Sequence, residues 1–223
     1  MKAMILAAGR GTRMATLTDD TPKPLLKVGG KALVVWHIER LVAAGVKEIV
    51  INHAYLGQQV EDTLGGGQQW GAQITYSPES TALETAGGIA NALPLLGTDS
   101  FLVVNGDVFC DIDYMTLVTA LPKPNLAHLV MVDNPPEHPK GDFVLQAGKL
   151  KAAGENQLTF SGVGVYSPAL FDNVVQGKAA RLAPLLTAAM ADGLVTGGHH
   201  QGVWHDIGTP ERLREIDRQL KAG

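Results

Sequence analysis

The sequence predicts an α/β fold in which a mostly parallel, doubly wound sheet lies between two layers of helices. Short apolar runs alternate with segments of helical periodicity up to Val132. Glycine-rich or polar segments follow several of these runs, as they do at the ligand-binding ends of open α/β sheets. With 223 residues, 45% of them hydrophobic, the chain is long enough for one domain spanning residues 1–223.

The first half of the chain alternates regularly between expected strands and expected helices. Residues 2–7 form an apolar run that ends in glycines, which is typical of a buried parallel strand. Apolar side chains then recur at helical spacing from Val34 to Val42, before Gly45. Further strands are expected at 48–52, 73–76, 101–105 and 129–132, and helices at 58–64, 85–93 and 114–121.

The second half of the chain has a less regular pattern. Strands are expected at 142–151 and 158–166 around a turn, and helices at 182–191 and 211–221. Ligands of an open α/β sheet bind beyond the carboxyl ends of its strands. The unusual segments of this chain follow Ala7, Tyr76 and Asn105, so we expect their polar residues to converge.

The composition excludes several classes of function. The formal net charge is −4 and 18% of the residues are charged, so no basic field would gather a nucleic-acid backbone. Cys110 is the only cysteine, which excludes an intramolecular disulfide and a multi-cysteine zinc site. The apolar run Ala3–Ala8 is too short to span a membrane, and Arg10 and Arg13 follow where a signal peptide would stay apolar. We therefore expect a cytoplasmic protein without a nucleic-acid or membrane partner.

The segment Leu6–Met14 is a candidate phosphate-binding loop. Gly9 and Gly11 would let backbone N–H groups approach a polyphosphate, and Arg13 would add a charged fork. The segment is not a dinucleotide fingerprint, because Met14 takes the third glycine position, and no Gly-Lys-Ser/Thr follows as in a Walker A loop. On its own it is equally compatible with an ordinary turn between a strand and a helix.

Lys23 stands between Pro22 and Pro24, which hold the backbone in an extended, rigid segment. We expect this segment to be an exposed loop. In one interpretation, the rigid backbone holds the lysine ammonium group in position to bind an anionic substrate. In the alternative, the segment is a surface turn with a solvated lysine. Its position just beyond the glycine loop favours the first interpretation.

Two carboxylates are candidate ligands of Mg²⁺. Asp107 directly follows the apolar run 101–105, and Asp206 precedes a turn and the last expected helix. Each aspartate alone is more often a helix cap or a turn residue. Together they match the habit of Mg²⁺, which takes one or two protein carboxylates with substrate phosphates and waters.

Four segments in a fixed order carry a resemblance to a known family, namely residues 6–13 (LAAGRGTR), 22–26 (PKPLL), 105–107 (NGD) and 204–210 (WHDIGTP). Over nearly its whole length the chain resembles the sugar-1-phosphate nucleotidylyltransferases. The resemblance implies a Rossmann-like, three-layer α/β sandwich, Mg²⁺ as cofactor, and a nucleoside triphosphate and a sugar 1-phosphate as substrates. It implies catalytic roles for Arg13 and Lys23. It implies nucleotide contacts for Gly9, Gly11, Thr12, Arg13, Lys23 and Asn105, and metal contacts for Asp107 and Asp206.

The same resemblance implies contacts to the base and the sugar. It assigns the base to Glu79, Gly87 and Gly88, and the sugar to Gly141, Glu155 and Gly162. Glu79 stands where thymidylyl and uridylyl members often have glutamine, and an ionised carboxylate, which only accepts hydrogen bonds, suits the amino edge of guanine. Asn156 and Gln157 replace the lysine and proline that follow the family's sugar-side glutamate, which indicates an atypical and roomier sugar site.

The expected reaction is in-line attack by the sugar 1-phosphate on the α-phosphorus of UTP, with release of pyrophosphate. The expected sugar is N-acetylmuramate 1-phosphate, ahead of N-acetylglucosamine 1-phosphate. The alternatives are guanylyl transfer to mannose 1-phosphate and a catalytically silent regulatory subunit, against which Arg13, Lys23 and the two aspartates argue. The segment Trp204–Pro210 disfavours cytidylyl transfer to a non-sugar phosphate. We expect no obligatory protein partner and, because the chain ends soon after that segment, no β-helical C-terminal domain.

Overall fold

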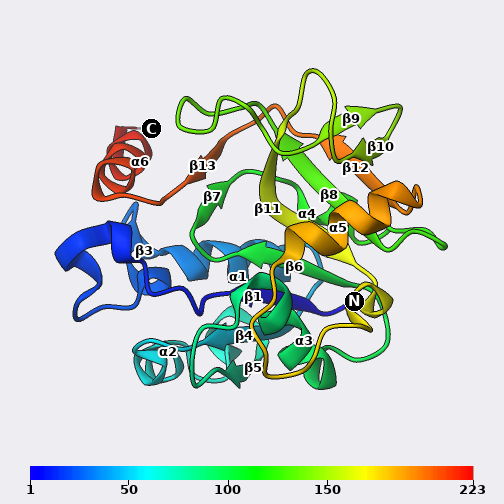
Figure 1. Ribbon diagram of the computed structural model, residues 1–223. Helices are drawn as coiled ribbons and strands as arrows, with labels where there is room; N and C mark the ends of the chain where they lie inside the picture. Colours follow the sequence, from blue (N-terminus) through cyan, green and yellow to red (C-terminus); the bar gives the residue numbers. More distant parts are fainter. Residues whose placement is uncertain (223) are drawn as a thin grey trace.

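The computed structural model describes residues 1–222 and has the predicted α/β architecture (Figure 1). Its main sheet consists of β1 (Ala3–Leu6), β4 (Glu48–His53), β5 (Gln73–Pro78), β6 (Phe101–Asn105), β8 (Ala127–Val132), β9 (Val144–Gln146), β10 (Lys149–Lys151), β11 (Thr159–Tyr166) and β12 (Val195–His199). Within the described residues, these nine strands follow one another across the sheet in the order β5-β4-β1-β6-β11-β8-β12-β10-β9.

Helices and two small ribbons complete the fold. The α-helices are α1 (Leu33–Ala43), α2 (Gly57–Leu64), α3 (Glu84–Leu96), α4 (Tyr114–Leu117), α5 (Leu182–Ala191) and α6 (Pro210–Ala222). The 3-10 turns are η1 (Thr12–Thr18), η2 (Lys23–Leu25), η3 (Gln68–Trp70) and η4 (Pro168–Phe171). The ribbons pair β2 (Lys27–Val28) with β3 (Lys31–Ala32), and β7 (Val108–Cys110) with β13 (Trp204–Asp206). None of the helices in residues 1–222 is long and apolar enough to cross a bilayer.

The sheet is mixed, as predicted, and its two halves differ. Strands β5, β4, β1 and β6 are parallel neighbours. Strand β11 is antiparallel to both β6 and β8, and β10 is antiparallel to both β12 and β9. Parallel neighbours need a crossover, usually a helix, as α1 provides between β1 and β4. Strands β8 to β11 follow one another without an α-helix, and the neighbours among them pair antiparallel.

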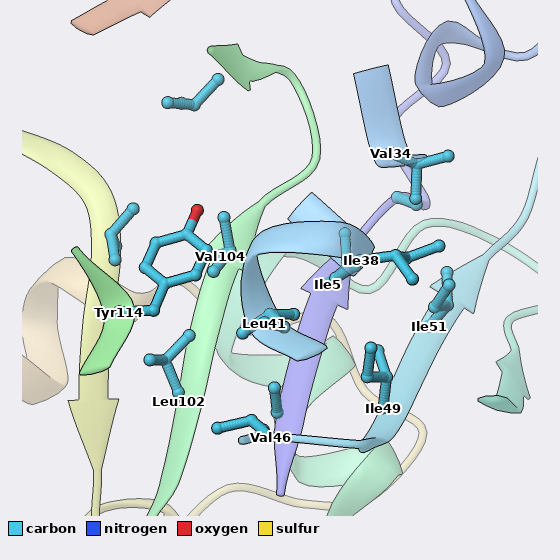
Figure 2. Packing of buried hydrophobic residues seen from close by; sticks show 14 of the residues in the cluster. Ile5, Val34, Ile38, Leu41, Val46, Ile49, Ile51, Leu102, Val104 and Tyr114 are labelled. Atoms are coloured by element: carbon cyan, nitrogen blue, oxygen red, sulfur yellow. The ribbon is translucent and has the colours of Figure 1, made fainter. Parts of the chain in front are cut away.

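Helices cover both faces of the sheet because successive strand side chains point to opposite sides. Along β1, Ala3 and Ile5 join the apolar cluster that contains α1, whereas Met4 joins the cluster that contains α3 and α5. Figure 2 shows Ile38 and Leu41 of α1 beside the strand residues of the first cluster. The predicted three-layer sandwich is therefore confirmed.

The strand order of the sheet reverses beside β1. Strand β4 lies on one side of β1 and β6 on the other, with Leu6 level with Asn105. The N–H of Gly106 donates to the carbonyl of Leu6 at 2.9 Å. A Cβ at Gly106 would lie 2.8 Å from that oxygen, so a larger residue would push the two strand ends apart. The segments after β1 and β6 thus leave the sheet at one switch point, where open α/β sheets bind ligands.

Helix α4 is shorter than its sequence predicts and ends at Leu117 instead of residue 121. Its start is as expected, since the Asp113 carboxylate accepts a hydrogen bond from the N–H of Met115. The N–H of Val118 then bonds to the carbonyl of Met115, which is the tighter spacing of a 3-10 turn. The chain therefore leaves the helix before Pro122.

Candidate active site

The ribbon β7–β13 brings two aspartates together from distant parts of the chain. Val108 of β7 lies opposite Asp206 of β13, and the N–H of Ile207 donates to the carbonyl of Asp107 at 2.9 Å. Both aspartates line a cavity of about 320 Å³, the aspartate cavity, whose wall also includes Arg13. Asp107, Asp206 and Arg13 therefore converge at the switch point of the sheet.

Each aspartate has a cation beside it. Lys23 Nζ lies 2.6 Å from Asp107 Oδ2, and Arg212 Nη1 lies 3.1 Å from Asp206 Oδ2. Burial and the negative charge of Asp107 raise the pKa of the Asp206 carboxyl above its ordinary value, although nearby cations oppose the effect. The two carboxylates repel each other, and a further cation bound to both would relieve this repulsion.

The donor set at these aspartates fits Mg²⁺. In the described part of the chain, no three His, Cys, Asp or Glu side chains lie close enough together to hold a metal ion. A cation bound by Asp107 and Asp206 would therefore need further oxygen ligands from substrate and water. Mg²⁺ commonly binds in this way, whereas structural zinc sites take four protein ligands.

Lys23 is buried, which corrects the expectation of an exposed loop. Pro22 is extended, as predicted, but Lys23 then starts the turn η2 and is only 7% exposed. The glycine loop closes over its side chain, since a Cβ at Gly11 would lie 3.2 Å from Lys23 Cδ. Gly11 has a φ of +70°, which favours glycine. Lys23 thus lies between the glycine loop and Asp107.

The glycine loop contributes to two neighbouring cavities. Gly9 lines a cavity of about 220 Å³, the Glu79 cavity, together with Lys23. Arg13 lines the aspartate cavity. Gly11 packs on Lys23, and Thr12 is exposed at the start of η1, so neither residue lines these cavities. The structure therefore places Gly9 and Arg13 at the site more directly than Gly11 and Thr12.

Glu79 is buried in the wall of the Glu79 cavity and is held from two sides. Its Oε1 accepts a hydrogen bond from Asn52 Nδ2 at 2.7 Å, and its Oε2 accepts one from the N–H of Leu83 at 2.8 Å. Asn52 Oδ1 in turn accepts from the N–H of Ala7 at 2.8 Å. No motif singles out Asn52, but a polar amide at the carboxyl end of an apolar strand is the signal that could have found it.

Gly87 and Gly88 lie inside α3 and are not among the residues that line the Glu79 cavity, so their contact with the base stays a prediction. The N–H of Gly87 donates to the carbonyl of Ala180 at 3.1 Å. A Cβ at Gly88 would lie 2.7 Å from the carboxylate of Glu79. Both glycines therefore allow close packing around α3, and Thr85 is the residue of this segment that lines the cavity.

Asn105 lies where three cavities meet. It lines the Glu79 cavity, the aspartate cavity and a cavity of about 520 Å³, the Arg181 cavity. Gly162 lines the aspartate cavity beside it and has a φ of +78°. A Cβ at Gly162 would lie 2.6 Å from Asn105 Nδ2, so the glycine leaves room for the amide.

The sugar contact of Glu155 stays a prediction. Glu155 is exposed between β10 and β11 and lines none of the three cavities. Gly141 does not line them either, but its φ of +69° forms the turn that leads into Asp142. Asp142 lines both the aspartate cavity and the Arg181 cavity.

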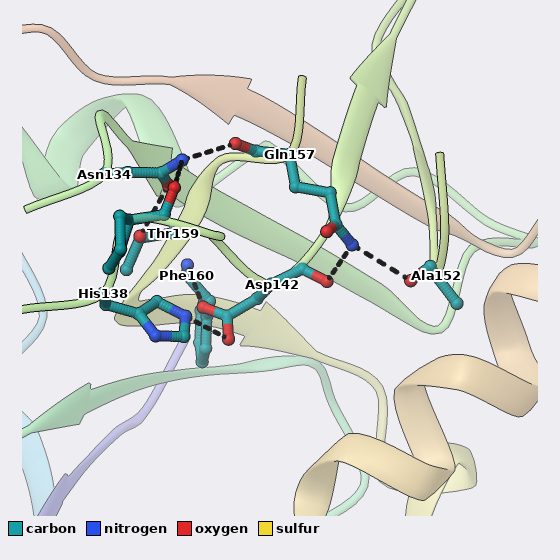
Figure 3. Close-up of polar contacts among 8 residues, drawn as sticks. Asn134, His138, Asp142, Ala152, Gln157, Thr159 and Phe160 are labelled. Carbon is teal, nitrogen blue, oxygen red and sulfur yellow. Dashed lines mark hydrogen bonds and ion pairs between the residues drawn. The ribbon is translucent and has the colours of Figure 1, made fainter. Parts of the chain in front are cut away.

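A hydrogen-bond network fixes the loop after β8 beside these cavities (Figure 3). The carboxylate of Asp142 accepts from the N–H of Phe160 at 2.8 Å and lies 3.0 Å from His138 Nε2. Thr159 Oγ1 donates to Asn134 Oδ1 at 2.8 Å. All of these side chains except Asn134 line the aspartate cavity. Thr159 and Phe160 lie beside Gly162 in the segment that the resemblance indicated, whereas no motif pointed to Asn134, His138 or Asp142.

The comparisons with known proteins agree with this geometry. A family profile described as Nucleotidyl transferase matches residues 2–149. The chain is 55% identical over 222 residues to an N-acetylmuramate alpha-1-phosphate uridylyltransferase of Neisseria meningitidis serogroup B, with 96% of each chain covered. The chain belongs to the nucleotidyl transferase family. The family expected from the four sequence segments is thereby confirmed.

More distant nucleotidyl transferases match as well. A Caulobacter vibrioides protein with the same name as the Neisseria relative is 37% identical, with 98% of this chain and 96% of that chain covered. A mannose-1-phosphate guanylyltransferase catalytic subunit beta of Xenopus tropicalis is 30% identical and is covered over 62% of its length, against 95% of this chain. A solved Bacillus anthracis structure superposes with a TM-score of 0.87 at 22% identity, covering 99% and 95% of the two chains, which shows the fold alone.

In this nucleotidyl transferase, buried side chains fix the aspartate-bearing strand β7 to α1. His37 Nε2 donates to the carbonyl of Val108 at 2.7 Å, and its Nδ1 accepts from the hydroxyl of Tyr114 at 2.9 Å. Since a carbonyl only accepts, the proton of the neutral ring must lie on Nε2. Arg40 donates to the carbonyl of Cys110, the next residue but one along β7. Burial lowers the pKa of His37 from 6.5 to about 4.

We expect the stability of the protein to fall as the pH drops from 7 to 5. Unfolding allows His37 to take up a proton that it cannot hold in the folded protein, so the free energy of unfolding decreases by about 2 kcal/mol over this interval. His37→Gln can keep both hydrogen bonds and should remove that part of the pH dependence. Urea unfolding at pH 5, 6 and 7 checks this. Equal slopes in the parent and the variant would contradict a neutral, buried His37.

Proposed function

We propose that the protein transfers a uridylyl group from UTP to a sugar 1-phosphate, with N-acetylmuramate 1-phosphate as the preferred acceptor, and releases pyrophosphate. The observation that carries this proposal is the meeting of Lys23, Asp107 and Asp206 at the switch point of the sheet. Separate cavities for two substrates open on either side of Asp107. The similarity to the uridylyltransferase of Neisseria meningitidis supports the choice of substrates.

The residues of the site suit an in-line displacement. The attacking phosphate oxygen is already an anion near neutral pH, so the protein needs no general base and must mainly bring two repelling anions together. Lys23 would neutralise the α-phosphate and the incoming phosphate, and Arg13 the charge that develops on pyrophosphate. Mg²⁺, when bound by Asp107 and Asp206, would supply further charge neutralisation on the triphosphate.

The Glu79 cavity is the proposed place of the nucleoside. Both carboxylate oxygens of Glu79 already accept hydrogen bonds from the protein, so this carboxylate mainly fixes the wall of the cavity. The amino group of a guanine would be a third donor to the same carboxylate. Since a carboxylate has about four acceptor positions, these two bonds leave Glu79 able to accept a further donor, and the choice of UTP rests on the similarity to the uridylyltransferase relatives.

The aspartate cavity and the adjoining Arg181 cavity are the proposed place of the sugar. The two cavities share Asn105, Asp142 and Phe160, so a substituent on the sugar has room to extend from one into the other. Arg181 is the one cation among the described residues that line the larger cavity, where it pairs with Glu84 at 3.3 Å and is 80% exposed. A 3-O-lactyl group combines a methyl group with a carboxylate, which fits apolar walls with a cation at the rim.

We also infer that residues 1–223 act as one domain. Strand β13 and helix α6 come from the end of the chain, yet Asp206 completes the site that begins with the loop after β1. Leu213 and Ile216 of α6 pack in one cluster with Met14 and Phe109. The site as a whole therefore combines residues from both ends of the chain.

Selectivity tests the proposed function. We expect kcat/KM to be highest for UTP with N-acetylmuramate 1-phosphate when UTP and GTP are each combined with that sugar, N-acetylglucosamine 1-phosphate and mannose 1-phosphate. Arg181→Gln should reduce the preference for the muramyl sugar about fivefold, as roughly 1 kcal/mol is the most that an exposed ion pair usually contributes. Lys178→Gln is the matched control, because Lys178 lies in the same segment outside the cavity.

Two outcomes would count against the proposed function. A preference for GTP with mannose 1-phosphate would make the protein a guanylyltransferase. The reaction class, nucleotidyl transfer to a sugar 1-phosphate, would then be unchanged. Binding of UTP without magnesium-dependent release of pyrophosphate would make it a regulatory subunit.

A further inference from the structure

One guanidinium joins three separate segments at the edge of the aspartate cavity. Arg212 belongs to α6, and its Nη2 lies 2.8 Å from Glu137 Oε1 in the loop after β8. Its Nη1 lies 3.1 Å from Asp206 Oδ2 and donates to the carbonyl of Asp206 at 3.3 Å. Glu137 and Asp206 both line the aspartate cavity. The side chain of Arg212 is only 24% exposed, so this contact is better shielded than an ordinary surface ion pair.

The helix that carries Arg212 is itself held firmly. Leu213 and Ile216 pack against Met14 of η1 and Phe109 of β7. Farther along the helix, Asp217 accepts a hydrogen bond from the N–H of Gly29 at 2.9 Å. Packing thus fixes the base of the Arg212 side chain relative to the ribbon β7–β13. Its guanidinium can therefore act as a fixed support for the groups that it contacts.

Glu137 lies in the middle of a loop whose two ends are anchored elsewhere. Asn134 bonds to the carbonyl of Gln157 at 2.8 Å, and Asp142 is held by Phe160 and His138. Within residues 1–222, Arg212 is the one ion-pair partner of Glu137. The Arg212 contact therefore joins the contact of the neighbouring His138 with Asp142 in holding the middle of this loop at the wall of the cavity.

We propose that Arg212 is a positioning residue that couples the metal-binding aspartate to the sugar side of the site. It fixes the Asp206 carboxylate for the cation, and through Glu137 it holds the loop after β8 over the sugar 1-phosphate. A guanidinium can serve two carboxylates at once, whereas the single ammonium group of lysine is a point charge. Because coupling between two ligands is reciprocal, metal binding should tighten sugar binding and the reverse. The proposal rests on the proposed function of the site.

Four variants separate the two contacts. Arg212→Met removes both, Glu137→Gln removes the charge on the loop side only, and Arg212→Lys keeps one charge in place of the fork. Arg214→Met is the matched control, because Arg214 is 68% exposed on the same helix and its one ion-pair partner within residues 1–222 is Glu211 of that helix. For each variant, we would measure KM for N-acetylmuramate 1-phosphate and for UTP, the half-saturating Mg²⁺ concentration, Mn²⁺ affinity by electron paramagnetic resonance, and the melting temperature.

The expected pattern is specific to coupling. Arg212→Met should weaken Mn²⁺ affinity and raise the half-saturating Mg²⁺ concentration about tenfold, the lower end of the effect of removing a residue that orients a metal ligand. It should also raise KM for the sugar 1-phosphate severalfold and leave KM for UTP nearly unchanged. Glu137→Gln should raise only KM for the sugar 1-phosphate. Arg212→Lys should recover part of the metal affinity and not the sugar affinity, and Arg214→Met should behave as the parent.

Two results would overturn the proposal. One is an unchanged Mn²⁺ affinity in Arg212→Met, and the other is an equal rise in KM for UTP and for the sugar 1-phosphate, which would place Arg212 at the triphosphate. A lower melting temperature of Arg212→Met without the expected loss of Mn²⁺ affinity and rise in KM for the sugar 1-phosphate would show that Arg212 has a structural role only. Mn²⁺ binding requires no turnover, so the comparison of Arg212→Met with Arg214→Met decides the proposal even if the parent proved inactive with UTP.

Discussion

Replacing either Asp107 or Asp206 with asparagine is expected to lower the rate of pyrophosphate release by about 10²-fold or more. An amide offers a neutral oxygen in place of an anionic one, and Mg²⁺ is a hard cation that prefers charged oxygen ligands. Because the ribbon β7–β13 places the two carboxylates side by side, both should contribute to one cation. The double variant should therefore lose little more activity than either single variant. Initial rates over a range of Mg²⁺ concentrations check this.

The stability of these variants should separate from their activity. Asp206→Asn removes a buried charge and its repulsion with Asp107, the two causes that raise the pKa of Asp206. Because these offset the lost ion pair with Arg212, the melting temperature without Mg²⁺ should not fall. Asp62→Asn, at an exposed position of α2, is the matched control and should leave the rate unchanged. If the losses of the two single variants multiplied in the double variant, the aspartates would act independently and a shared metal would be wrong.

Lys23→Met is expected to reduce turnover by about 10²-fold or more, since it removes one fixed charge from the transition state. The buried environment of Lys23 determines the choice of substitution. Methionine keeps most of the alkyl chain that packs beneath Gly11, whereas alanine would also leave a gap. We therefore expect Lys23→Met to melt at a higher temperature than Lys23→Ala, while both are equally slow.

The matched control for this prediction is Lys27→Met. Lys27 is exposed at the start of β2, so this variant should retain the parent rate. Pyrophosphate release and thermal melting, measured on all three variants, separate charge from packing. An unchanged turnover number in Lys23→Met would remove Lys23 from the proposed mechanism. If turnover falls, the melting data show whether unfolding is the cause.

Local patterns predict the parts of this fold that local physics determines. The apolar runs at Ala3–Leu6 and Phe101–Asn105 form buried strands because they cannot remain in water, and Gly45 ends α1 where the helical spacing stops. The convergence of the segments after β1 and β6 follows from the rule that ligands bind at a switch point. These features require no knowledge of distant contacts.

Long-range contacts account for what the sequence could not predict. Strands β7 and β13 have three residues each, too few for any periodicity, and their pairing joins the middle of the chain to its end. The burial of Lys23 depends on its partner Asp107, which no local pattern reveals. Gly87 resembles a ligand-binding glycine in sequence, yet its N–H bonds to Ala180 in a segment far along the chain. In each case a tertiary contact decides the role of the residue.

The ribbon β7–β13 also has a consequence for the order in which the protein is made. Synthesis runs from the N-terminus, so Asp107 leaves the ribosome long before Asp206 does. Until β13 arrives, the edge of β7 has no partner strand, and an unpaired edge can pair with another chain. In the folded protein, His37 and Arg40 hold β7 against α1 through bonds that do not involve β13. A nascent chain of this protein therefore acquires the second carboxylate of its site only after β13 has been made.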